Sequence, residues 1–183
     1  HTFSTINYPW GWKDPSNTFT LPIWKMFYPK CKVIYVLRHP ADVALSLLKR
    51  NENIKSGHYY SKKSLIASKY LSLLSFSHSE KSYSDKLNDL NDCINLYNIY
   101  YNEINKYKDG NILFVKFEEL LKNPKKIFKN ICDFTNIDYN KINIDVLCKD
   151  IKSERAYAYL KLNLDSKSKS IVESKITKHI YNE

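Results

Sequence analysis

Apolar residues recur along this chain with two different periods, and each period predicts a different kind of element. Two short runs are almost continuously apolar and rich in β-branched and aromatic residues, at Val33–Leu37 and Ile112–Phe117. Such runs are typical of strands that are buried on both faces, as in a parallel sheet. Prolines flank the first run, and the turn signal Asp109-Gly110-Asn111 precedes the second. We therefore predict that both strands lie in one parallel sheet.

The longest helical pattern runs from Asp85 to Tyr107, where apolar side chains are spaced alternately three and four residues apart. These side chains are Leu87, Leu90, Ile94, Tyr97, Tyr101 and Ile104. The stripe predicts one amphipathic helix. It fits either packing onto a sheet or the seam of a coiled coil, and tyrosine within so short a seam favours packing.

Shorter helical patterns cover much of the remaining chain. They are expected from Ser16 or Asn17 to Pro29, from Pro40 to about Asn53, from Ser64 to Phe76, from Pro124 with Asn123 as its cap, and in a polar tail beyond Asn140. The apolar side chains of the first helix are Leu21, Ile23, Trp24 and Phe27. Strands separated by long helices predict an α/β fold. Ligands of such folds bind beyond the carboxyl ends of the strands, where Arg38 and Glu118 are predicted to lie.

The chain is strongly basic, and lysine supplies nearly all of the positive charge. The formal net charge is +10, and Arg38, Arg50 and Arg155 are the only arginines. Codon bias explains a lysine-rich composition without any functional cause, and an anionic ligand or polymer is the alternative. In a chain that otherwise uses lysine, a retained arginine indicates a need for its planar, two-pronged donor group.

Several classes of site are not indicated by the sequence. The cysteines, at positions 31, 93, 132 and 148, have neither metal-ligand nor redox spacing, and we expect them to be small apolar residues in a reducing compartment. The three glycines are far apart, so this stretch has no glycine-rich phosphate loop. No apolar run approaches the roughly 20 residues that span a bilayer. The chain begins with His1 rather than Met, so we expect an upstream segment.

The segment from Arg38 to Ser46, where a strand is predicted to end and a helix to begin, has the chemistry of an anion site. The Arg38 guanidinium can form two parallel hydrogen bonds with a phosphate. The start of the helix adds N–H groups and the positive end of its dipole. The Ser46 hydroxyl can reach an anion that lies beside the helix. The structural alternative is an ion pair between Arg38 and Asp42.

The sequence KVIYVLRHPADVALS, Lys32–Ser46, resembles the 3′-phosphate-binding motif of sulfotransferases that use 3′-phosphoadenosine 5′-phosphosulfate (PAPS). In that family a hydrophobic strand ends in Arg, then Pro and Asp follow, and a Ser comes two helical turns later. The resemblance implies that Arg38 and Ser46 bind the 3′-phosphate of the co-substrate. Phe114–Pro124 resembles the family's later strand and loop, and the helix after it ends, as in the family, in the run Ile131-Cys132-Asp133-Phe134.

A third segment, Trp12-Lys13-Asp14-Pro15, resembles the strand end that precedes this motif in bacterial-type members, although Ser16 stands where the family often has Arg. Lys13 is then the candidate that stabilises charge on the leaving oxygen. Some branches of the family use a histidine as the base, and no histidine occupies a matching position here. Other branches use a carboxylate, so the resemblance leaves Asp14 or a residue upstream of His1 as the candidate base. The alternative for Lys13 is a surface lysine beside two tryptophans.

The resemblance implies a P-loop-NTPase-like three-layer parallel sheet with flanking helices, of which residues 1–183 form a single partial domain. It covers residues 8–137, while 140–183 form an unassigned helical tail. The family's 5′-phosphosulfate loop would lie upstream of His1, so we expect no activity from this stretch by itself. No metal, nucleic acid or membrane is implied, and a cytoplasmic location is expected unless an upstream anchor places the enzyme in the Golgi lumen.

The implied reaction transfers a sulfuryl group from PAPS to a hydroxyl or amine of a small-molecule or glycan acceptor. Two alternatives stay open: a nucleotide-binding remnant of the same fold without catalysis, and a basic helical module that binds nucleic acid or anionic surfaces. The second lacks the arginines and the aromatic side chains on a strand face that such binding requires.

Overall fold

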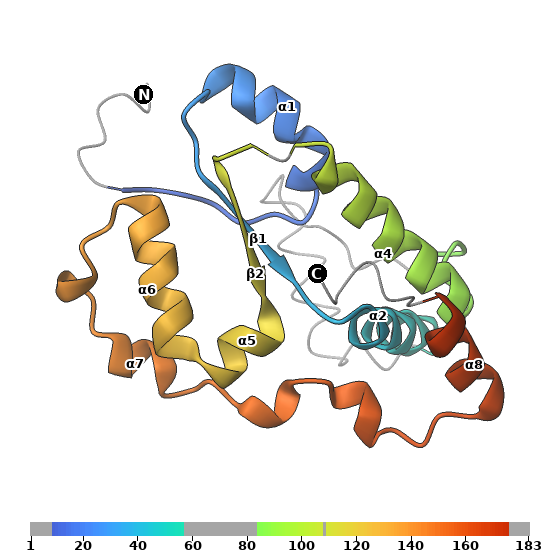
Figure 1. Cartoon of the computed structure of the whole chain (residues 1–183). Coiled ribbons are helices and arrows are strands. Elements are labelled where there is room, and N and C mark those ends of the chain that lie inside the picture. Colours follow the sequence, from blue (N-terminus) through green and yellow to red (C-terminus); the bar gives the residue numbers. More distant parts are fainter. Residues whose placement is uncertain (1–8, 57–83, 108, 176–183) are drawn as a thin grey trace, which may run out of the picture. The chain divides into compact units, whose positions relative to one another are not determined.

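The computed structural model describes residues 9–56, 84–107 and 109–175, which form two compact units (Figure 1). The first unit comprises His1–His39 and Asn98–Ala158, and the second comprises Pro40–Tyr97 and Tyr159–Glu183. The predicted polar stretch Gly57–Ser64 and the predicted helix Ser64–Phe76 lie outside the described residues. The helices and strands are α1 (Asn17–Phe27), β1 (Val33–Leu37), α2 (Pro40–Lys55), α4 (Leu90–Asn105), β2 (Ile112–Lys116), α5 (Phe117–Lys122), α6 (Pro124–Thr135), α7 (Ile144–Cys148) and α8 (Ser166–Lys175), with short 3-10 turns η2 (Tyr139–Lys141), η3 (Ser153–Arg155) and η4 (Ala158–Lys161).

The two predicted strands pair in parallel, as expected. Their register runs from Val33 opposite Ile112 to Leu37 opposite Lys116, so both strands end at the same edge of the sheet. The second strand is one residue shorter than predicted, because Phe117 already begins α5. The reason is local. Good helix formers follow Lys116, and two acidic residues in the first turn interact favourably with the positive end of the helix dipole.

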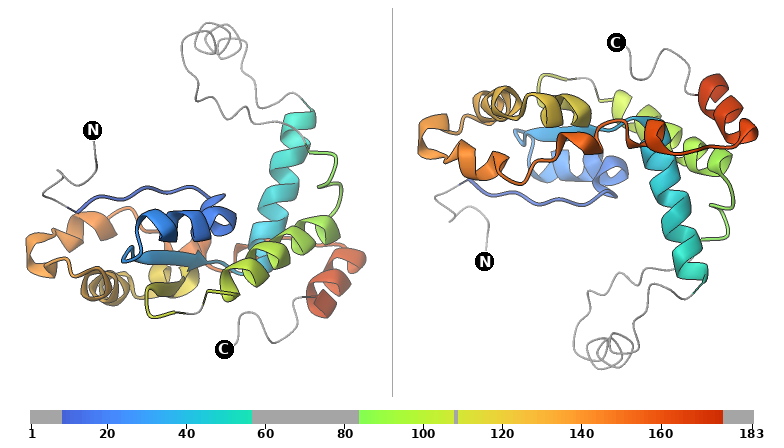
Figure 2. Two further views of the ribbon diagram at one scale, coloured as in Figure 1. Left: turned by 90° about the horizontal axis from the view of Figure 1, so that it is seen from above. Right: turned by 90° about the horizontal axis from the view of Figure 1, so that it is seen from below.

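In the first unit, α1 covers one face of the sheet, as Figure 2 shows. Its core joins Leu21 of α1, Ile104 of α4 and Ile112 of β2, with Val33, Tyr35, Tyr107 and Phe114 packed around them. Tyr35 and Phe114 are opposite each other in the register, and their rings lie 5.8 Å apart. Parallel strands usually bury both faces, and here the side chains on one face of this pair meet helices of the same unit.

The predicted apolar stripe of α1 is only partly correct. Leu21 is buried, whereas Ile23 is 53% exposed and Phe27 is 70% exposed. The buried positions are Thr18 and Leu21, three residues apart, so the face toward the core is narrower than the sequence suggested. Ser16 occupies the capping position as predicted, but its side chain forms no capping bond; its hydroxyl donates to Asp14 instead.

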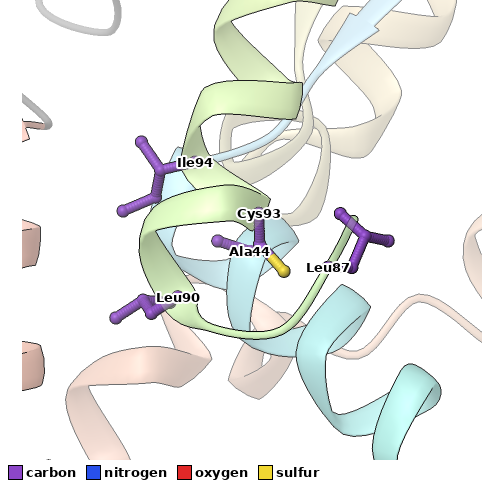
Figure 3. Packing of buried hydrophobic residues seen from close by; sticks show 5 residues of the cluster. All are labelled: Ala44, Leu87, Leu90, Cys93 and Ile94. Atoms are coloured by element: carbon purple, nitrogen blue, oxygen red, sulfur yellow. The ribbon is translucent and has the colours of Figure 1, made fainter. Parts of the chain in front are cut away.

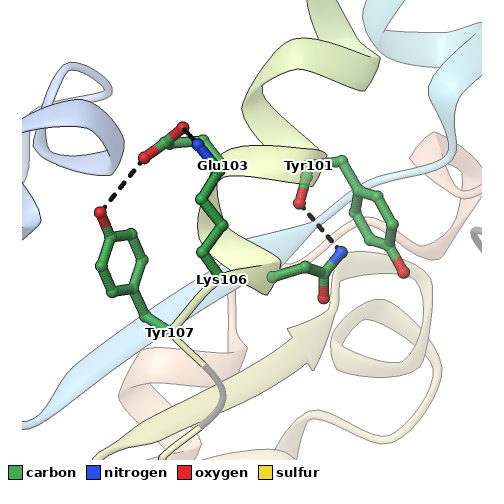
Figure 4. Close-up of polar contacts among 5 residues, drawn as sticks. Tyr101, Glu103, Lys106 and Tyr107 are labelled. Carbon is green, nitrogen blue, oxygen red and sulfur yellow. Dashed lines mark hydrogen bonds and ion pairs between the residues drawn. The ribbon is translucent and has the colours of Figure 1, made fainter.

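A cluster of polar side chains lies at the C-terminal end of α4 (Figure 4). The carboxylate of Glu103 accepts hydrogen bonds from Lys106 Nζ at 2.5 Å and from the Tyr107 hydroxyl at 3.2 Å. The bond from Lys106 is the main cause that lowers the pKa of Glu103. Glu103 is therefore ionised at neutral pH, and its contribution to stability is lost only as the pH falls through this lowered pKa.

The second unit is built around the first half of α4 and the start of α2. Ala44 of α2 packs against Cys93 and Ile94 of α4, as Figure 3 shows, together with Leu87 and Leu90. Ile171 and Val172 of α8 pack against the same cluster. The predicted packing of the long apolar stripe onto a sheet is therefore confirmed for Ile104, whereas Leu87, Leu90 and Ile94 pack against helices.

The helix begins later than predicted, at Leu90 rather than at Asp85. The reason is a cap: Asp89 Oδ1 accepts a hydrogen bond from the Asp92 N–H at 2.9 Å, and Asp92 Oδ2 accepts one from the Asn88 N–H at 3.1 Å. Aspartate is a preferred N-cap, so the helix starts where these bonds form. Leu87 is nevertheless buried, in the turn that precedes the helix.

The cysteines are free thiols, and two of them are buried as small apolar residues, as expected. Cys93 and Cys132 are buried, while Cys31 and Cys148 are half-buried. Burial is the main cause that raises the pKa of Cys93 to about 11. This thiol is therefore protonated at neutral pH and contributes to the core by packing.

A buried asparagine connects α2 to the turn before α4. Asn51 Nδ2 donates to the carbonyl oxygens of Ser84 at 3.0 Å and Leu87 at 2.9 Å. Its Oδ1 accepts from the Ser84 N–H at 2.9 Å. One amide side chain thus satisfies three backbone groups, a match that no apolar residue can replace.

We predict that Asn51→Ala lowers the free energy of unfolding by about 2–3 kcal/mol, because it leaves buried backbone groups of Ser84 and Leu87 without partners. Denaturant titration followed by circular dichroism measures this loss. Asn95→Ala, the same substitution at an exposed position of α4, is the control and should change stability by less than about 0.5 kcal/mol. Equal losses in the two variants would contradict the assigned role of Asn51.

Candidate functional site

The carboxyl ends of β1 and β2 bring together two of the residues that the sequence singled out. Arg38 follows the last residue of β1, and Glu118 lies in the first turn of α5, two residues beyond β2. Because Leu37 is paired with Lys116, both residues lie at one edge of the sheet. This edge is where α/β proteins place their ligands.

The half-buried side chain of Arg38 is held on two sides. Its guanidinium lies over the ring of Phe117, 5.1 Å from the ring centre, at a distance typical of a cation–π contact. Its Nη2 donates to the backbone carbonyl of Arg155 at 3.4 Å. An arginine side chain has many rotamers, and these contacts restrict it before any ligand arrives.

Glu118 is a buried carboxylate that supports the backbone beside Arg38. Its side chain is almost completely buried, and Oε1 accepts a hydrogen bond from the His39 N–H at 3.0 Å. The bond spans 79 residues of sequence and connects the segment after β1 to α5. Hydrogen bonds that involve a charged acceptor are stronger than neutral ones, so this bond restrains the turn that carries Arg38.

The same turn is contacted from the C-terminal part of the chain by Tyr157. The rings of His39 and Tyr157 pack edge to face, with centres 5.7 Å apart. Burial is the main cause that raises the pKa of the Tyr157 hydroxyl, and the charges of Glu118 and Glu119 add to it. The hydroxyl is therefore neutral at physiological pH. The histidine of the motif is oriented by Glu118, which accepts from its N–H, and by the ring of Tyr157.

Ser46 and Asp42 lie on α2, which belongs to the second unit. Ser46 is exposed. Asp42 is buried in the first turn of α2, where its Oδ1 accepts a hydrogen bond from the Tyr159 N–H at 2.7 Å. A buried acid at this position also favours the helix dipole. Arg38 belongs to the other unit, so both its joint site with Ser46 and its alternative pairing with Asp42 stay predictions.

Lys13 and Asp14 are exposed and line a large cavity of the first unit, about 980 Å³ in volume. Asp14 Oδ1 accepts hydrogen bonds from the Ser16 hydroxyl at 2.6 Å and the Ser16 N–H at 2.8 Å. The hydroxyl bond is the main cause that lowers the pKa of Asp14. Asp14 therefore stabilises the turn that leads into α1, and it is ionised at neutral pH.

Aromatic side chains form much of the wall of this cavity. Trp10 and Trp12 stack with ring centres 5.5 Å apart, and Trp12 packs on Trp24 at 4.6 Å. The indole N–H groups have local partners: Trp12 donates to Asn17 Oδ1 and Trp24 donates to Thr20 Oγ1, both at 3.2 Å. Lys13 lies in the same cavity lining as Trp10 and Trp12. This agrees with the alternative interpretation of Lys13 as a surface lysine beside two tryptophans.

Sequence reasoning missed three contributors to the site: Phe117, Arg155 and Tyr157. Phe117 was assigned to the strand. Its position directly before Glu118, which the sequence placed at the carboxyl end of the strand, was the one signal that it lies near the site. Arg155 carried one usable signal, because it is one of only three arginines in a lysine-rich chain. Tyr157 carried none, since tyrosine is abundant in this sequence and its contact with His39 depends on tertiary structure.

The chain belongs to the sulfotransferase domain family, whose model matches residues 18–182. The match includes Arg38, Ser46 and Glu118, and it extends through the tail that carries Arg155 and Tyr157. Members of this family are transferases of sulfuryl groups, which agrees with the resemblance carried by Lys32–Ser46. Searches of curated proteins and of solved structures found no significant match. Among the residues that the structure describes, no helix has both the length and the apolar character to cross a membrane.

We predict that Glu118→Ala lowers the free energy of unfolding by about 1.5–3 kcal/mol, because the partly buried His39 N–H loses a charged acceptor. Glu118→Gln keeps an acceptor oxygen and should cost roughly half as much. The measurement is chemical denaturation at neutral pH.

Glu119→Ala is the matched control for this prediction, because Glu119 is the exposed neighbour on the same short helix. It should leave stability nearly unchanged. If Glu118→Ala proved as mild as Glu119→Ala, the bond to His39 would not restrain this turn.

Proposed function

We propose that this protein transfers a sulfuryl group from PAPS to a hydroxyl or amine of a small-molecule or glycan acceptor. The observation that supports the proposal most is that the Arg38 side chain, at the carboxyl end of β1, is restrained by contacts with its neighbours. Its guanidinium contacts both the Phe117 ring and the Arg155 carbonyl, and α2 begins two residues later at Pro40. Family membership makes sulfuryl transfer the reaction to expect of such a site.

The residues of this chain fit the nucleotide end of PAPS. A restrained guanidinium suits the two-bond recognition of a phosphate, which lysine cannot reproduce. We assign Arg38 and Ser46 to the 3′-phosphate, with Arg38 providing the charge and Ser46 a single hydroxyl donor. The N-terminus of α2, with Pro40 in its first turn, adds a region of positive potential for an anion.

For the transfer step we assign Lys13 and Asp14. PAPS supplies the sulfuryl group; the acceptor oxygen or nitrogen attacks its sulfur, and the bond from sulfur to the bridging phosphate oxygen breaks. Lys13 neutralises charge on that oxygen, and Asp14 accepts the proton of the acceptor. The lowered pKa of Asp14 keeps it ionised and able to accept a proton, although it also makes Asp14 a weaker base.

We further propose that β1 and β2 belong to a larger P-loop-like parallel sheet with helices on both faces. The support is the exposure of apolar strand residues: Ile34 is 38% exposed and Val36 is 53% exposed. Central strands of such sheets are normally buried on both faces. A cytoplasmic location stays a prediction.

We predict that Arg38→Ala weakens the binding of adenosine 3′,5′-bisphosphate by roughly 2–5 kcal/mol, because a charged, two-bond contact is lost. Arg38→Lys should recover only part of this loss. Ser46→Ala should cost about 1 kcal/mol, as for one hydrogen bond. Isothermal titration calorimetry of each variant provides the measurement.

Two controls accompany this titration. Adenosine 5′-phosphate, which lacks the 3′-phosphate, should bind nearly equally to all variants. Arg50→Ala removes an exposed arginine of α2 and should affect neither nucleotide. If Arg38→Ala weakens both nucleotides equally, or neither, Arg38 is structural and the nucleotide site is wrongly assigned.

We predict that Lys13→Ala lowers kcat of the full-length protein by about 10²–10³-fold, because charge on the leaving oxygen is no longer neutralised. Asp14→Asn keeps an acceptor for Ser16 but removes the base, and should lower kcat by about 10²–10⁴-fold. Transfer of radiolabelled sulfate from PAPS to phenol and sugar acceptors measures both effects.

Lys30→Ala is the control for Lys13, because Lys30 is an exposed lysine that lines the same cavity. It should keep full activity. If Asp14 is the base, the acidic limb of the rate profile lies below the ordinary aspartate pKa of 3.8, since its pKa is lowered. A limb near pH 6 would identify another group as the base. Nucleotide binding without any transfer would favour the non-catalytic alternative.

A further inference from the structure

A short segment of the C-terminal tail, residues 153–157, lies against the end of β1. It begins with the 3-10 turn η3, Ser153–Arg155, which packs against α5. The carbonyl of Arg155 accepts the hydrogen bond from Arg38, and two residues later the Tyr157 ring packs edge to face on His39. One segment thus contacts two consecutive residues of the motif.

The backbone of Tyr157 is in an unusual conformation. Its φ is 49°, in the left-handed region that residues with a β-carbon seldom adopt. Glycine is the ordinary choice at such a position, since it reaches this region without steric cost. A tyrosine is found there only where the surroundings hold it, and such outliers gather at functional sites. The ring contact with His39 is the feature that a glycine would lose.

We propose that the 153–157 segment is a positioning element for the nucleotide site, in which the Arg155 carbonyl and the Tyr157 ring hold Arg38 and His39 in the orientation that 3′-phosphate binding requires. The inference rests on the proposed role of Arg38. It adds a task for the tail, which sequence reasoning had left unassigned. The Tyr157 ring contacts His39, so in this proposal Tyr157 acts through His39 and is a positioning residue.

The physical basis is preorganisation. A free arginine side chain loses rotamer freedom when it binds a phosphate, and that loss weakens binding. Here the Phe117 ring lies against the guanidinium, and the Arg155 carbonyl engages Nη2. On the other side of the turn, Glu118 holds the His39 N–H while Tyr157 holds its ring.

The test uses three variants that separate the ring of Tyr157 from its backbone conformation. Tyr157→Phe keeps the ring and removes only the hydroxyl. Tyr157→Gly removes the ring but accepts the left-handed backbone without strain. Arg38→Ala removes the group that is to be positioned. Each variant of the full chain is titrated calorimetrically with adenosine 3′,5′-bisphosphate and with adenosine 5′-phosphate, and its unfolding midpoint is recorded.

Tyr157→Phe should bind both nucleotides like the wild type. Tyr157→Gly should bind the bisphosphate about 2–10-fold more weakly, the range expected from the loss of one aromatic contact, and the 5′-phosphate nearly as well as before. This selective loss is a result that general destabilisation would not produce.

Two outcomes overturn the inference while leaving the proposed function in place. In the first, Tyr157→Gly retains the full preference for the bisphosphate although Arg38→Ala abolishes it. In the second, Tyr157→Gly weakens both nucleotides equally, which would make the segment merely structural. If instead Arg38→Ala itself leaves the preference unchanged, the nucleotide site and this inference are both wrong.

Discussion

The parallel pairing of β1 with β2 is the constraint on which the candidate site depends. Parallel strands end at the same edge of a sheet, so the residues that follow Leu37 and Lys116 must meet. Without this register, Glu118 would not reach the His39 N–H, and the Phe117 ring would not lie against Arg38. The site is thus a consequence of backbone hydrogen bonding before it is a matter of side-chain chemistry.

The same edge of the sheet also positions a cation, the guanidinium of Arg38. The Arg38 guanidinium contacts the Phe117 ring and donates to the Arg155 carbonyl, and both contacts restrict its position. The buried carboxylate of Glu118 accepts from the backbone beside it, which places negative charge near the turn and stiffens it. This arrangement is the basis of the nucleotide site that we propose for this member of the sulfotransferase domain family.

Where the sequence misjudged an element, a local side-chain bond or a packing choice was decisive. The long helix starts at Leu90 because Asp89 caps it, although the apolar spacing extends further upstream. The stripe of α1 was assigned too broadly because apolar side chains occur on both of its faces, and only packing decides which face is buried. The sequence proposed Asp14 as the catalytic base. Its hydrogen bonds with Ser16 give it a second role, in stabilising the turn before α1, which the sequence pattern did not indicate.

The sequence by itself determined the two strands, their parallel order, the helices that begin at Pro40 and Pro124, and the motif that carries Arg38 and Ser46. These features depend on apolar period, proline and glycine positions and short-range spacing, which are all local properties. Only the tertiary structure decided that Arg155 and Tyr157 lie against the end of β1, since Arg38 and Arg155 are 117 residues apart. A contact of that range leaves no periodic trace, because it depends on how the sheet and the tail pack rather than on neighbouring residues.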